Sequence, residues 1–141
     1  MASFLRTIGF VITASALLGA ASAAVARPRL TGEEALAKAL EGRVAGKPVN
    51  CIGQAFTAST RVFDKTAIIY ETGRTMYVQR PTSGVESLNN TVTLVTNIYG
   101  SQLCNVDIVR LIDRNGFFFR GFVGLGPFVP YTKPAKVALA D

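Results

Sequence analysis

The sequence contains no histidine and no tryptophan, and its only two cysteines are Cys51 and Cys104. Without histidine the chain cannot form a Ser-His or Cys-His nucleophile pair, a histidine-containing zinc site or the facial-triad site of iron oxygenases. Two cysteines are too few for a disulfide-dense toxin scaffold, and an apolar content of 49% is too high for a wholly disordered protein. We therefore expect neither a metal site nor a cofactor.

Runs of positive charge are also absent, since no three basic residues are consecutive. Lysine and arginine nevertheless outnumber the acidic residues by 15 to 9, which gives a net charge of +6. Positive charge dispersed in this way does not predict a polybasic membrane patch. The length of 141 residues is enough for one domain.

The N-terminus has the organisation of a signal peptide. Arg6 precedes the uncharged residues 7–26, whose apolar centre gives way to small residues ending in Ala24-Val25-Ala26. Signal peptidase requires small residues of this kind, and Ala21-Ser22-Ala23 is an alternative motif. A retained anchor is the other interpretation, because twenty uncharged residues can just span a bilayer. We predict a cleaved signal peptide over residues 1–26.

The rest of the chain divides into a lead-in and short helix at 27–47, a β domain at 48–134 and a tail at 135–141. Thr31 and Glu34 have the spacing of a capping box, and apolar residues then recur at helical intervals. Beyond Pro48 the pattern alternates as in strands, and glycine-containing turns at Gly73 and Gly116 predict hairpins. We predict a mainly β fold, a small antiparallel sandwich or barrel of about six strands with one N-terminal helix.

Export would permit a disulfide, and two cysteines allow a single pairing, Cys51 with Cys104. Two reactive thiols are the alternative, but no neighbouring residue of either cysteine lowers a thiol pKa in an obvious way. We therefore predict the disulfide.

The acidic residues do not form an evident catalytic pair. Asp107 and Asp113 are six residues apart in an expected strand, which separates them by about 20 Å. Glycosidase carboxylates lie about 5–9.5 Å apart. Asp64 and Glu71 could meet another acid only through the fold. We expect no enzymatic activity, and keep a small carboxylate-based hydrolase or lyase as the alternative.

Aromatic and basic residues alternate near the C-terminus. Within twelve residues lie Phe117, Phe118, Phe119, Phe122 and Phe128, interleaved with or flanked by Arg110, Arg114, Arg120 and Lys133. In one interpretation alternate phenylalanines fill the core while the arginines face water. In the other, the segment binds an anionic envelope polymer or an exported protein, and the candidate residues are Arg110, Arg120, Phe128, Tyr131 and Lys133. Nucleic acid is not an expected partner, since exported proteins rarely meet it.

The segment Gly124–Pro134 contains three prolines, and proline removes amide donors. We therefore expect an irregular segment that cannot be a central strand. It would either clamp the end of the fold, with Phe128 and Tyr131 buried, or remain an exposed ligand, as in an inhibitor of another exported protein. We adopt the clamp.

Several motifs occur in the order found in one family. They are Cys51-Ile52, Arg61-Val62 with Asp64, Ile68-Ile69-Tyr70 with Gly73, Gln102-Leu103-Cys104 with Asp107, and the segment L-G-P-F-V-P-Y-T-K at 125–133. In these residues the chain resembles a family of small exported proteobacterial proteins of unknown function. The resemblance covers roughly residues 51–133 and implies export and a small disulfide-linked β-rich domain, without an activity. Relatives carry a second cysteine pair near Ser83 and Val123, so the resemblance implies that Cys51 and Cys104 form the retained bridge.

Together these observations predict a periplasmic or secreted bacterial protein that acts by binding or as an envelope accessory. Its membrane contact would be limited to the signal segment before cleavage.

The signal peptide is tested by mass spectrometry of the protein from its native compartment. We expect the mature N-terminus to lie between Ala24 and Arg27, because small residues precede that point. An intact Met1 in the membrane fraction would instead identify a retained anchor.

Overall fold

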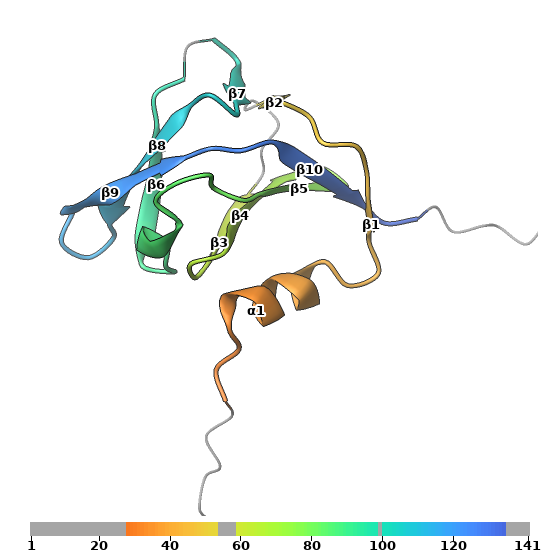
Figure 1. The fold of residues 1–141 in the computed structure, drawn as a ribbon, viewed down its shortest axis with the longest axis horizontal. Coiled ribbons are helices and arrows are strands. Elements are labelled where there is room, and N and C mark those ends of the chain that lie inside the picture. The colour runs from red at the N-terminus through yellow and green to blue at the C-terminus, as the bar shows by residue number, and fades with distance from the viewer. Residues whose placement is uncertain (1–27, 54–58, 99, 135–141) are drawn as a thin grey trace, which may run out of the picture.

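The computed structural model describes residues 28–53, 59–98 and 100–134 (Figure 1). The predicted signal peptide and the tail at 135–141 lie outside the described residues. The elements are, in chain order, α1 (Gly32–Ala39), β1 (Val44–Ala45), β2 (Cys51–Gly53), β3 (Ser59–Phe63), β4 (Ala67–Thr72), β5 (Thr75–Gln79), the 3-10 turn η2 (Val85–Ser87), β6 (Val92–Thr96), β7 (Gln102–Cys104), β8 (Ile108–Asp113), β9 (Phe119–Gly124) and β10 (Phe128–Thr132).

The strands form three antiparallel sheets, which do not close into a barrel. The largest has the order β1-β10-β5-β4-β3, the second β6-β8-β9, and the third pairs β2 with β7. The predicted mainly β fold with one short N-terminal helix is confirmed. The described residues contain ten strands rather than about six, because strands of two or three residues are too short to show an alternating pattern.

Strand β4, an internal strand of the five-stranded sheet, is buried on both faces. Ala67 and Ile69 pack in one cluster with Leu36 of α1. Ile68 and Tyr70 point the opposite way, into the cluster that the three-stranded sheet completes. Strand side chains alternate between faces, so an unbroken run of apolar residues is the pattern of a strand covered on both sides. The fold is therefore layered as helix, sheet and sheet.

Helix α1 begins at the predicted capping box. Thr31 accepts a hydrogen bond from the Glu34 amide at 3.3 Å, and Glu34 accepts one from the Thr31 amide at 2.8 Å. The bond from the Thr31 amide, and a second one from the Thr31 hydroxyl at 2.9 Å, lower the pKa of the Glu34 carboxyl. A Cβ at Gly32 would lie 2.1 Å from the Asp64 carbonyl, so only glycine allows the helix to start this close to the turn between β3 and β4.

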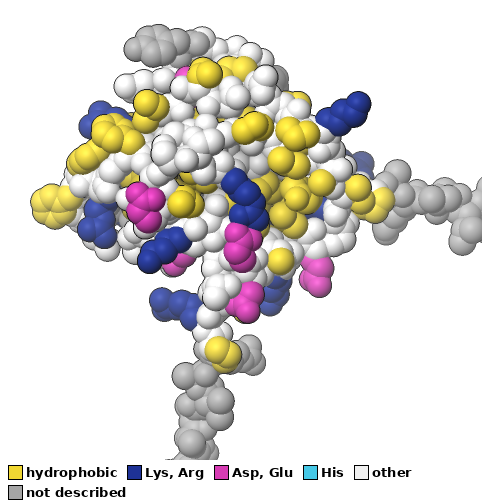
Figure 2. Space-filling model, viewed as in Figure 1, with side chains coloured by type: hydrophobic (Ala, Val, Ile, Leu, Met, Phe, Trp, Pro, Cys, Tyr) yellow, Lys and Arg dark blue, Asp and Glu magenta, His cyan; other side chains and the backbone are white. Residues whose placement is uncertain are grey.

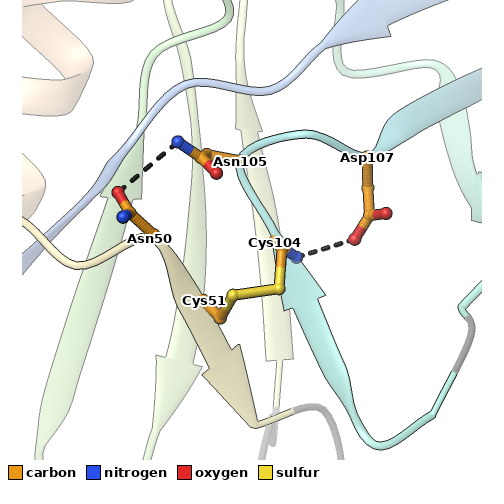
Figure 3. Close-up of a disulfide and its surroundings, with 5 residues drawn as sticks. All are labelled: Asn50, Cys51, Cys104, Asn105 and Asp107. Atoms are coloured by element: carbon orange, nitrogen blue, oxygen red, sulfur yellow. Dashed lines mark hydrogen bonds between the residues drawn. A yellow bond between two sulfur atoms is a disulfide. The ribbon is translucent and has the colours of Figure 1, made fainter.

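The predicted disulfide between Cys51 and Cys104 is present (Figure 3). The two residues are direct partners in the β2–β7 ladder and are separated by 53 positions in the chain. Closing a loop of that length stabilises the fold by about 4 kcal/mol in the loop-entropy model. Next to the bridge, the backbone amide of Cys104 donates to the Asp107 carboxylate at 2.7 Å. The backbone amide of Asn105 donates to the backbone carbonyl of Asn50, also at 2.7 Å.

The proline-rich segment is a strand, so the prediction that it could not occupy an internal position was wrong. Strand β10 lies between β1 and β5. Pro130 is tolerated because its carbonyl accepts from the Gly46 amide at 2.7 Å, on the side away from β5. The amide and carbonyl of one residue face the same side of a strand, so the missing donor leaves the β10–β5 ladder intact. Phe128 is fully buried, as the clamp interpretation required, and the segment is not an exposed ligand.

Replacement of Phe128 by alanine measures how much β10 holds the core together. The ring has no exposed surface and meets Tyr70 edge to face, with 5.9 Å between ring centroids. We expect Phe128→Ala to lower the free energy of unfolding by about 3–5 kcal/mol in a denaturant melt. The matched control Phe118→Ala removes an exposed ring and should stay within about 0.5 kcal/mol of wild type. Equal midpoints for the two variants would contradict this account.

Candidate functional site

The site that the structure singles out is the hairpin formed by β8 and β9. Its ladder is irregular: Leu111 pairs with Gly121, but Ile112 pairs with Phe119, so Arg120 is an extra residue on β9. Such a bulge shifts the side-chain alternation by one residue. Phe119 and Phe122 therefore share the outer face although they are three residues apart. Their rings meet edge to face, with 4.8 Å between centroids.

The interpretation in which alternate phenylalanines fill the core was wrong for the stretch between residues 117 and 122, where none is buried. The exposed fraction is 83% for Phe117, 71% for Phe118, 52% for Phe119 and 53% for Phe122. We call residues 108–124, with these four rings, the aromatic hairpin. Figure 2 shows hydrophobic side chains projecting at the left end of the molecule, where Figure 1 places β9 and the loop before it. Lys or Arg side chains lie beside them.

Three arginines accompany the exposed rings. Arg110 lies directly opposite Phe122 in the ladder, on the outer face. Arg120, in the bulge, lies 3.7 Å from the Asp113 carboxylate. Arg114 donates to the Val92 carbonyl at 3.3 Å, towards the opposite edge of the sheet. All three are exposed, so the hairpin combines aromatic surface with positive charge.

The loop at the tip is held by Asp113. Its carboxylate accepts hydrogen bonds from the backbone amides of Asn115 at 2.9 Å and Gly116 at 3.1 Å. The pKa of Asp113 is lowered by these two amides, of which the Gly116 amide has the larger effect. The nearby Arg120 guanidinium lowers it further. The turn expected at residues 113–116 is a longer loop between β8 and β9, in which Phe117 adopts a φ of 55°. A left-handed conformation costs a non-glycine residue about 1–2 kcal/mol.

The five residues proposed from the sequence as a binding surface are not brought together. Arg110 and Arg120 belong to the aromatic hairpin, whereas the other three lie in or just after β10 of the five-stranded sheet. Phe128 is buried and Tyr131 packs against the cluster under α1, so neither ring is a free surface. Lys133 is exposed. Regular alternation does not predict that all of these rings are exposed. The sequence did carry one signal, because three consecutive phenylalanines in a strand cannot all face the core.

A separate groove of about 520 Å³ runs between β3 and β6. Among its described lining residues are the cations Arg61 and Arg114, and no acid. Two of the acids considered for catalysis have structural partners: Glu71 pairs with Arg61 of this groove at 2.7 Å, and Asp107 accepts from the Cys104 amide. Neither the groove nor the hairpin thus joins two carboxylates within the described part of the chain.

The described residues contain no group of three cysteine or acidic side chains that could hold a metal ion. None of the helices in residues 28–53, 59–98 and 100–134 is long and apolar enough to cross a membrane. Comparison with family models, curated proteins and solved structures finds no match. The resemblance to the exported proteobacterial family remains a prediction.

The role of Asp113 is testable by pH titration. Because its pKa is lowered in the folded protein, its stabilising contribution is complete above the ordinary value of 3.8 and is lost as pH falls through the lower folded value. We expect the NMR amide signals of Asn115 and Gly116 to titrate with a midpoint below 3.8. In Asp113→Asn, which keeps an acceptor oxygen, this transition should disappear. A midpoint at or above the ordinary value would show that the carboxylate does not hold the loop.

Proposed function

We propose that the protein is exported and acts, without catalysis, as a binding or envelope accessory protein whose contact surface is the aromatic hairpin. One observation carries the proposal: four phenylalanines of a single hairpin are each more than half exposed. Soluble domains rarely expose contiguous apolar surface of this kind unless it contacts a partner.

The rest of the fold gives no reason for these rings. The two buried clusters are complete without them, since the inner face of β8 and β9 is supplied by Val109, Leu111 and Val123. The exposed set instead has the composition of an interface, in which aromatic residues and arginine are enriched and acidic residues depleted.

Two independent features support the proposed location of the protein outside the cytosol. The Cys51–Cys104 disulfide is consistent with an oxidising compartment, because thiols stay reduced in the cytosol. The uncharged stretch after Arg6, with its small-residue ending, supports export into such a compartment. The periplasm, or the space outside the cell, is therefore the proposed location.

The charge of the hairpin indicates the chemistry of the partner. Arg110, Arg114 and Arg120 outnumber its single acid, Asp113, so an anionic envelope polymer or an acidic patch on another exported protein would complement it. If the protein inhibits such a partner, it would also do so through the aromatic hairpin, because β10 is paired with β5 within the sheet. A carboxylate-based hydrolase or lyase has less support, because the acids described above are engaged in ion pairs and loop contacts.

Photo-crosslinking in cells tests the proposal. Benzoylphenylalanine at position 118 or 122 replaces one aromatic ring by another and keeps the surface aromatic. The matched control places benzoylphenylalanine at Val44, which is 61% exposed but lies on β1 of the five-stranded sheet. We expect adducts from 118 and 122 that the control does not give. Equal yields from all three positions, or none, would remove the hairpin as the contact surface.

A further inference from the structure

We infer that the tip of the aromatic hairpin, residues 113–118, inserts into the surface of an anionic phospholipid bilayer. This inference rests on the proposed function, because it names the partner of the same hairpin. It goes further than the sequence prediction, which limited membrane contact to the signal segment. Three features of the described residues support it: the shape of the tip, its charge and its rigidity.

The tip is an apolar protrusion. Phe117 and Phe118 are consecutive and are the two most exposed phenylalanines described, at 83% and 71%. In Figure 2 a hydrophobic side chain marks the far left of the molecule, at the hairpin end. A protein partner would need a cavity shaped for two protruding rings, whereas the soft interface of a bilayer accepts them without one. Phenylalanine is typical of the apolar face that interfacial protein segments bury at the boundary between headgroups and acyl chains.

The charges near the tip suit lipid phosphates. Arg114 precedes the two rings in the chain and Arg120 follows them, and Arg110 lies further from the tip, near the start of β8. The one acid of the hairpin, Asp113, directs its carboxylate at the amides of its own loop and at Arg120. An anionic surface would therefore meet cations before it meets an uncompensated carboxylate. Each such cation contributes about fivefold to membrane partitioning when it comes close to the headgroups.

The tip is also preorganised. The Asp113 amide donates to the Phe118 carbonyl at 2.8 Å, and the Phe117 amide donates to the Asp113 carbonyl at 3.0 Å. Together with the carboxylate contacts, these bonds close the loop in the conformation that projects both rings. The left-handed backbone of Phe117 belongs to this conformation and is retained although the ring makes no core contact. Little ordering of the loop would remain to be done on contact with a bilayer.

The absence of tryptophan from the chain allows a direct experiment. Phe118→Trp places a single indole at the tip, and Val44→Trp places one on β1 as the matched control. Each full-length protein is mixed with vesicles of phosphatidylglycerol and phosphatidylethanolamine, or of phosphatidylcholine alone. Because the readout is local, it reports the tip even where residues 7–26 are retained and bind vesicles themselves.

We expect the emission of Trp introduced at position 118 to shift to shorter wavelength, and to be quenched by brominated acyl chains, only with the anionic vesicles. The control at position 44 should not respond. Adding Arg120→Gln to Phe118→Trp should weaken vesicle binding about fivefold.

Two results would overturn the inference. An unshifted indole at position 118 with anionic vesicles, alongside protein adducts in the crosslinking experiment, would leave the hairpin as a binding surface but make its partner a protein. An equal shift with phosphatidylcholine would show that the arginines do not select the surface. If neither vesicles nor crosslinking give a signal at position 118, the proposed function fails together with the inference.

Discussion

The burial of β4 on both faces is the constraint from which the architecture follows. Its run from Ala67 to Tyr70 sends side chains alternately to two sides of the five-stranded sheet, and neither side can be left in water. Leu36 of α1 closes one side, and the three-stranded sheet closes the other. Among the described residues, no further layer covers the outer face of that second sheet. The rings of the aromatic hairpin are thus exposed because other side chains already fill the core.

Features set by neighbouring residues could be predicted from the sequence. The capping box at Thr31 and Glu34, the hairpin turn at Gly73 and the pairing of the only two cysteines each depend on a few residues and their spacing. The internal position of β10 could not be predicted in this way. It depends on which side of the strand the Pro130 nitrogen faces, and that is set by the partner strands rather than by the segment itself.

The exposed rings of the aromatic hairpin could not be predicted from the sequence for a similar reason. A prediction by alternation assigns Phe119 and Phe122 to opposite faces, and a single inserted residue, Arg120, puts them on the same one. Regular alternation therefore does not place both rings on the same face as each other. One bulge turns this apolar surface outward while the inner face stays filled.

The place of β10 in the sheet also governs when this protein can fold. The five-stranded sheet joins the beginning of the domain to its end, because β1 at Val44–Ala45 pairs only with the strand at Phe128–Thr132 among the described residues. A growing chain thus lacks an internal strand, and the ring that fills the core, until β10 has been made. Pairings this distant in sequence form slowly. The five-stranded sheet therefore stays incomplete until β10 has joined it.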